Sequence, residues 1–158
     1  MSELRFEYTH PIDDVFAKLV DAEHLRARSA AAGHRNIQIR VDEKGGAFEI
    51  RLERDIESEI PAFAKKFVNP VNHVIDTIRW RTDGEQKRGS YEAVVSARIR
   101  VRGDMTLRTS GAGTVFVSTC APTVDVPLVG GKIADLVAKK TLEAIEIDCR
   151  FTQRSFAS

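Results

Sequence analysis

Cysteine and net charge are both scarce in this sequence, and each scarcity excludes a class of protein. Its two cysteines, Cys120 and Cys149, are too few for a disulfide scaffold, and we expect two buried free thiols rather than a disulfide or reactive pair. The 24 Lys and Arg residues nearly balance the 23 Asp and Glu residues, which leaves a formal net charge of +1. A dedicated nucleic-acid binder normally has a strongly basic domain, so we expect no nucleic-acid partner.

Long apolar segments are also missing. Segment 1–9 alternates polar and apolar residues and has neither the apolar core nor the small-residue cleavage site of a signal peptide. No apolar run approaches the roughly 20 residues that cross a bilayer. We therefore expect a cytoplasmic protein without integral membrane association, either a monomer or a small homo-oligomer.

The composition that is present, 42% hydrophobic and 30% charged residues, is typical of a globular chain. A chain of this length buries on the order of 70% of its unfolded surface, so we expect residues 1–158 to form one domain with room for a cavity. A strand at 4–8 precedes two short helices that begin near Pro11 and Ala22, the second ending at Gly33. Period-two alternation then predicts further antiparallel strands near 37–41, 48–52, 74–80, 91–97, 105–107 and 115–119. In the last of these, Phe116 and Cys120 compete with Val117 and Thr119 for the inner face.

The longest helix is predicted to begin near Gly130 and Gly131 and to run through Phe151. Projection at about 100° per residue divides its apolar residues into two adjoining stripes. They are Ile133, Val137, Ala144, Ile147 and Phe151 on one, and Ala138, Leu142, Ile145 and Cys149 on the other. Such a wide apolar arc predicts a helix enclosed on more than one side, as by a strongly curved sheet.

This order of elements resembles the helix-grip fold of START-like and pollen-allergen-like proteins, the SRPBCC superfamily. Within it, segments Ile60–Phe63, Thr77–Trp80 and Val126–Ile133 are most similar to a bacterial family known only as a domain of unknown function. The resemblance implies an α+β fold: a seven-stranded curved antiparallel sheet, two short helices after strand 1, and a long C-terminal helix across the concave face. It also implies a cavity, which in relatives holds lipids, sterols or polyketides, and it does not by itself imply catalysis.

Asp76 is the most informative polar residue, because it shares strand parity with Val74, Ile78 and Trp80. If that face lines the cavity, desolvation would favour the protonated carboxyl and make Asp76 a candidate general acid, general base or ligand anchor. The alternative is an ordinary carboxylate near the sheet rim that pairs with an arginine or with water.

Lys140 and Asp148 interrupt the apolar arc of the long helix. Lys140 together with Asp76 or Asp148 would form a compensated polar patch able to orient a ligand. Alternatively, Lys140 packs its stem on the core and keeps its amino group in water. Tyr91 would offer a hydroxyl to the same cavity, or it is a core aromatic with one hydrogen bond.

The segment between Ile60 and Pro70 is predicted to form a short amphipathic helix, because Phe63 and Phe67 stand four residues apart. We expect these phenylalanines to form a lid over a ligand. The alternatives are a plug of the core end and, on weaker grounds, docking to a membrane surface through the aromatics and neighbouring lysines.

No metal or cofactor is expected, because the histidines have no zinc-ligand spacing and the Gly45-Gly46 pair is followed by a strand rather than a helix. His73 has the opposite parity from Trp80 and is expected to face solvent. Arg98, Arg100 and Arg102 share one strand face, and pairing with glutamates across strands explains them without nucleic acid.

These observations favour a non-catalytic protein that binds a small hydrophobic or amphipathic molecule, lipid-like or polyketide-like, between the sheet and the last helix. The candidate ligand-binding residues are Trp80, Tyr91, Met105, Lys140, Asp148 and Phe151, with Phe63 and Phe67 as the lid. One alternative is a cyclase- or dehydratase-type enzyme that uses Asp76 as its general acid or base. Another is an interaction module whose cavity is filled by its own side chains.

Overall fold

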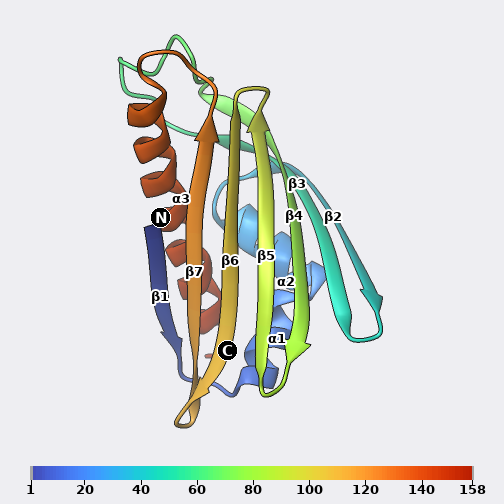
Figure 1. Cartoon of the computed structure of the whole chain (residues 1–158). Coiled ribbons are helices and arrows are strands. Elements are labelled where there is room, and N and C mark those ends of the chain that lie inside the picture. Colours follow the sequence, from blue (N-terminus) through green and yellow to red (C-terminus); the bar gives the residue numbers. More distant parts are fainter. Residues whose placement is uncertain (1, 158) are drawn as a thin grey trace.

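The computed structural model describes residues 2–157, which form one seven-stranded antiparallel sheet and three helices (Figure 1). Side chains along the strands alternate between the two faces of the sheet. The N-terminal half contains β1 (Ser2–Tyr8), α1 (Ile12–Leu19), α2 (Ala22–Ala31), β2 (Arg35–Lys44) and β3 (Ala47–Glu57). The C-terminal half contains β4 (Val71–Asp83), β5 (Gln86–Ser96), β6 (Ile99–Ser110), β7 (Gly113–Val124) and α3 (Gly130–Ser155). The predicted order of elements is confirmed.

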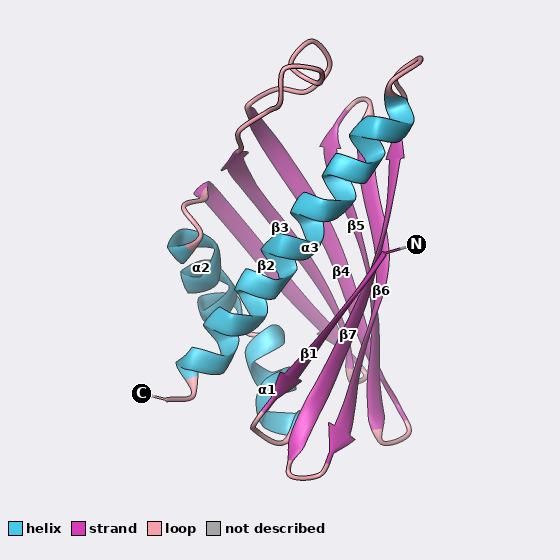
Figure 2. Ribbon diagram, turned by 90° about the vertical axis from the view of Figure 1, so that its left-hand side faces the viewer, coloured by secondary structure: helices cyan, strands magenta, loops and turns pink. Residues whose placement is uncertain are grey.

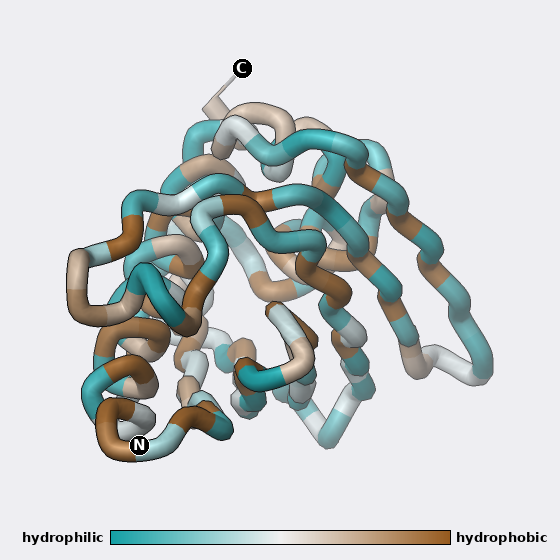
Figure 3. Tube along the Cα trace, turned by 90° about the horizontal axis from the view of Figure 1, so that it is seen from above, coloured by the Kyte–Doolittle hydropathy of each residue, from teal (hydrophilic) through white to brown (hydrophobic). Residues whose placement is uncertain are grey.

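The strands follow the spatial order β1-β7-β6-β5-β4-β3-β2. From β2 onward each strand pairs with the next one in the chain, and β1 closes the far edge against β7. Gly45 and Gly46 turn β2 into β3 with φ values of 61° and 82°, a conformation that favours glycine. The tube in Figure 3 shows apolar and polar residues alternating along the strands. Because successive side chains of a strand point to opposite faces, every second side chain is expected on the concave face.

Helix α3 crosses the concave face diagonally, with α1 and α2 beside its C-terminal half (Figure 2). Ile133, Cys149 and Thr152 are its buried residues. Ile147 was expected on the inner stripe, and that expectation is wrong: it is 55% exposed. Ile147 lies two residues, or about 200° of rotation, from the buried Cys149, so it points away from the sheet.

The inner side of β7 is formed by Phe116, Ser118 and Cys120, which resolves the open choice between the two parities of this strand. At the end of the sheet near α1, Phe16 packs edge-on against Trp80 with ring centroids 5.7 Å apart and against Phe48 at 5.5 Å. These aromatic rings close that end of the core.

A second apolar cluster closes the opposite end, where segment 58–70 meets the loop before α3. Its buried members are Ala64, Ile99, Val126 and Ile133, and Phe63 and Phe67 pack against them. The predicted short helix in this segment is wrong, because its residues form successive turns. Two of its backbone hydrogen bonds span three residues, from Ala64 to Pro61 and from Phe67 to Ala64, and one spans four, from Val68 to Ala64. An α-helix needs successive bonds that span four residues.

Both cysteines are buried free thiols, as expected. Burial raises the pKa of Cys149 to about 12. A thiol that stays protonated is a poor nucleophile, so Cys149 has the properties of a core residue.

The buried contact between α2 and α3 predicts a pH-dependent stability. His24 Nε2 lies 2.9 Å from Thr152 Oγ1, and burial followed by the Arg28 and Lys18 charges lowers the pKa of His24 to about 4. Because the unfolded chain binds this proton near pH 6.5 and the folded chain only near pH 4, folding stability falls as pH drops through that window. We expect His24 to contribute about 2 kcal/mol of the stability lost between pH 7 and pH 4.5.

Urea unfolding at these two pH values measures the effect in the wild type and in His24→Gln, and the variant should lose less stability on acidification. His73→Gln is the control, because the hydrogen bonds that the His73 ring donates to Asp55 and Glu53 raise the pKa of His73 and give its contribution the opposite sign. An equal loss in the wild type and His24→Gln contradicts the prediction.

Candidate functional site

A cavity of about 300 Å³ lies between the concave face of the sheet and α3. This volume is at the lower end of the roughly 300–1,000 Å³ typical of small-molecule sites. Trp80, Tyr91 and Met105 line it, as expected from their parity. The other apolar lining residues include Leu52, Val74, Ile78, Ala93, Val101, Phe116, Val137 and Ile145.

The Tyr91 hydroxyl is hydrogen-bonded to the backbone of the cavity wall. The hydroxyl donates a hydrogen bond of 2.8 Å to the Thr119 carbonyl oxygen on β7. Burial raises the pKa of Tyr91 above its usual value, so the group remains a protonated donor. Tyr91 thus has the geometry of a core aromatic with one hydrogen bond, which leaves its ring to line the cavity.

Asp76 points into the cavity and forms an ion pair with Arg54. Arg54 Nη1 lies 2.8 Å from Asp76 Oδ2 and donates a longer bond of 3.4 Å to the Leu52 carbonyl oxygen. The two side chains are only 12% and 13% exposed. A charge this far from water needs such a partner, and the geometry corresponds to the alternative in which an arginine pairs with Asp76.

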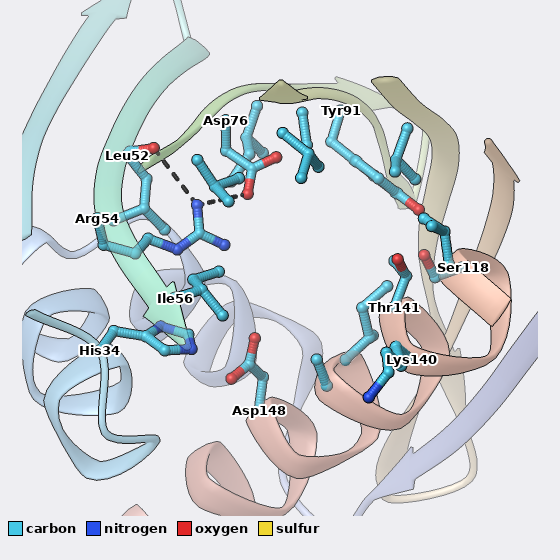
Figure 4. Close-up of a pocket in the computed structure, with 18 of the residues that line it drawn as sticks. His34, Leu52, Arg54, Ile56, Asp76, Tyr91, Ser118, Lys140, Thr141 and Asp148 are labelled. Atoms are coloured by element: carbon cyan, nitrogen blue, oxygen red, sulfur yellow. Dashed lines mark hydrogen bonds and ion pairs between the residues drawn. The ribbon is translucent and has the colours of Figure 1, made fainter. Parts of the chain in front are cut away.

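Asp148 faces the Arg54–Asp76 pair across the cavity (Figure 4), and it belongs to a second charged pair. Arg28 Nε of α2 lies 3.6 Å from Asp148 Oδ2 of α3. Between the pairs, the ring of His34 points inward from the loop after α2. Burial, followed by the charge on Arg54, lowers the pKa of His34, so the ring is neutral near pH 7. We call Arg28, His34, Arg54, Asp76 and Asp148 the polar end of the cavity.

Three buried nitrogen atoms of the polar end have no hydrogen-bond partner within residues 2–157. They are Arg28 Nε, His34 Nδ1 and Arg54 Nε. Buried polar atoms are normally hydrogen-bonded, so these three exceptions leave hydrogen-bonding capacity in the cavity for water or another bound molecule.

Three members of the polar end were not predicted from the sequence. Arg54 had a usable signal, since it shares the inward parity of Ile50, Leu52 and Ile56 on β3. Arg28 and His34 had none, because α2 has no clear apolar stripe and His34 belongs to a loop.

The mouth of the cavity is a groove between segment 58–70 and α3. Ile60, Val68, Leu136 and Lys140 line both the groove and the cavity. Within residues 2–157, no carboxylate lies within ion-pairing distance of the Lys140 amino group. The expected patch of Lys140 with Asp76 or Asp148 is therefore wrong. Asp76 and Asp148 pair with arginines, and eight residues of helix put Lys140 about 12 Å along the axis from Asp148.

The three phenylalanines assigned to the site do not line the cavity. Phe151 packs on His24 with ring centroids 5.5 Å apart, because its side of α3 faces α2. Phe63 and Phe67 pack in the second apolar cluster, and Lys132 Nζ lies 4.3 Å from the Phe63 ring. This placement corresponds to a plug of the core end, while Ile60 and Val68 of the same segment face the groove.

Charged residues on the convex face pair with one another. Arg100 and Arg102 lie 3.6 Å and 3.1 Å from Glu92 on the neighbouring strand. His73 faces outward as expected and contacts Asp55 at 2.7 Å. No cluster of three or more His, Cys, Asp or Glu side chains suited to a metal ion occurs in the described part of the chain.

Comparison with known proteins places the chain in a family. Residues 3–155 match a family described as "Protein of unknown function (DUF2505)". The chain belongs to this family. No curated protein matches it. Among residues 2–157 of this DUF2505 protein, no helix is long and apolar enough to cross a membrane.

Solved structures show the fold of this DUF2505 protein. TTHA0849 from Thermus thermophilus is 19% identical with a TM-score of 0.62, covering 97% of this chain and 95% of that one. A STAR-related lipid transfer protein from Xanthomonas axonopodis is 14% identical with a TM-score of 0.64, covering 99% and 85%. Zhui aromatase/cyclase from Streptomyces sp. R1128 is 14% identical with a TM-score of 0.62, covering 98% and 91%. The chain therefore has the START-like helix-grip fold.

Proposed function

We propose that this protein binds one small amphipathic molecule in the cavity between its sheet and α3. The observation that carries the proposal is a cavity of about 300 Å³ whose walls are apolar and whose ionisable groups gather mainly at one end. Burial of an apolar tail supplies affinity, and a few polar groups orient the ligand. Similarity to a lipid transfer protein and an aromatase/cyclase supports the use of this fold for apolar ligands.

Two alternatives have less support. An interaction module whose own side chains fill its interior has less support, because a cavity lies beside Trp80 and Met105. An enzyme that uses Asp76 as its general acid or base is supported by the position of this carboxylate on the cavity wall. However, Arg54 already occupies one of its oxygens at 2.8 Å, which favours a structural or anchoring role.

Uptake of the neutral fluorescent dye N-phenyl-1-naphthylamine tests the proposal. We expect the wild type to bind about one dye per chain, and Ala93→Phe to weaken binding at least about tenfold, or about 1.4 kcal/mol. Ala93 lines the cavity on β5, so a phenyl ring there occupies the space that a ligand needs.

Val94→Phe is the matched control, because Val94 is the next residue on β5 and faces the convex side. It should bind the dye as the wild type does, and urea unfolding should show that both variants are folded. A wild type that takes up no dye, or an Ala93→Phe variant that binds it normally, refutes the proposal.

A further inference from the structure

The charges of the polar end balance one another. Two guanidinium groups, Arg28 and Arg54, face two carboxylates, Asp76 and Asp148, in pairs separated by 3.6 Å and 2.8 Å. His34 lies among them as a neutral ring. A fully ionised head group would therefore meet like charges as closely as opposite charges. This arrangement favours an uncharged polar group.

The polar end has both hydrogen-bond donors and hydrogen-bond acceptors that are not used. Within residues 2–157 the hydrogen bonds of Arg54 come only from Nη1, and its guanidinium points toward the centre of the cavity (Figure 4). Asp148 makes only the 3.6 Å contact with Arg28, which is beyond hydrogen-bond reach, and His34 Nδ1 has no partner in these residues. The site thus offers free donors on Arg54 and free acceptors on Asp148 or neutral His34.

A hydroxyl is the simplest group that accepts and donates at once. A carboxylate would satisfy Arg54 but repel Asp76 and Asp148, and an ammonium would satisfy the carboxylates but repel the arginines. An ether or ester would accept from Arg54 and leave the acceptors unpaired, which is costly at a buried site.

We infer that the ligand is an alcohol or phenol whose hydroxyl binds at the polar end, between Arg54 and the acceptors on His34 and Asp148. This inference rests on the proposed function. The apolar part of the ligand then lies against Trp80 and Met105, which the strand register places on the far side of Asp76 from the mouth beside Lys140.

Competition against N-phenyl-1-naphthylamine with four straight-chain probes tests the inference. The probes are 1-decanol, 1-methoxydecane, decanoate and decylammonium, which share a tail and differ in the head group. We expect 1-decanol to bind at least about tenfold more tightly than each of the others, because each of the others leaves buried groups unpaired or repelled.

Two variants locate the hydroxyl. His34→Leu removes one acceptor and leaves both ion pairs, and Arg54→Met with Asp76→Leu replaces one pair by apolar side chains, a change that preserves folding in other buried pairs. We expect at least one of them to reduce the advantage of 1-decanol over 1-methoxydecane to about threefold or less while dye binding persists. His73→Leu, on the convex face, should keep the full advantage.

The outcomes separate the two proposals. Dye uptake by the wild type with decanoate or decylammonium as the tightest probe overturns the alcohol assignment and leaves ligand binding in place. Equal affinity for all four probes, or an advantage of 1-decanol retained in both variants, also overturns it. Failure of the wild type to take up the dye refutes the proposed function itself.

Discussion

Replacing Gly103 with alanine is expected to lower the free energy of unfolding by about 3 kcal/mol, because the added methyl group would overlap neighbouring atoms. Gly103 stands opposite Tyr91 in the pairing of β5 with β6. A Cβ there would contact the Thr119 carbonyl oxygen and the Tyr91 ring, with Tyr91 Cζ only 2.6 Å away. The Tyr91 ring cannot move aside without losing a hydrogen bond, because its hydroxyl reaches across β6 and donates to that same Thr119 carbonyl oxygen.

Gly131→Ala is the matched control. A Cβ at Gly131 meets nothing within 4 Å, and the residue lies in the first turn of α3. Alanine there should stabilise the fold by about 0.5 kcal/mol, because glycine has the more flexible unfolded chain. Urea unfolding compares the two variants with the wild type. If Gly103→Ala is as stable as the wild type, the close approach of Tyr91 to β6 is incorrect.

Gly103 also shows where periodicity stops being informative. Alternation predicted that Tyr91 faces inward, and the structure confirms this. Alternation did not predict that the Tyr91 ring lies across β6, because this arrangement requires a glycine, Gly103, opposite Tyr91 on that strand. The register between two strands is a property of the folded sheet, and single-strand patterns do not contain it.

Only part of the polar end was predicted from the sequence. Asp76 stood out because this carboxylate shares strand parity with Trp80. The same reasoning places Arg54 on the inner face of β3 together with Leu52, and it would have suggested that Arg54 pairs with Asp76 on the adjacent strand. Arg28 reaches the site from a helix and His34 from a loop, so only tertiary packing brings them there. Charged residues on an inner strand face were therefore the usable signal.

The phenylalanine predictions failed for a related reason. Phe63, Phe67 and Phe151 are apolar and belong to segments that border the cavity, yet Phe63 and Phe67 pack in the second apolar cluster and Phe151 packs on His24. Hydrophobicity predicts that a side chain is buried, and it does not predict which of several apolar surfaces will bury it. The order of strands and helices followed from periodicity over long segments and the helix-grip fold from the resemblance, whereas membership of the cavity wall depends on the tilt of α3.

Arg54→Met is expected to destabilise the protein by about 3–5 kcal/mol, because it leaves the Asp76 carboxylate in the cavity wall without a counter-charge. The ion pair is 2.8 Å long and both side chains are nearly shielded from water. Replacing both members, as Arg54→Met with Asp76→Leu, removes the unpaired charge as well and should cost about 2 kcal/mol or less. A double-mutant cycle that also includes Asp76→Leu measures the coupling.

The same two strands supply the control for this cycle. Arg79 and Glu49 form a 3.1 Å pair on the convex face of β4 and β3, with side chains 60% and 51% exposed. Arg79→Met should cost about 0.5 kcal/mol, because water replaces the lost partner. A loss of stability from Arg54→Met no larger than that from Arg79→Met would mean that the Asp76 carboxylate is well hydrated. The polar end would then lie in water rather than in a cavity that selects the head group of a ligand.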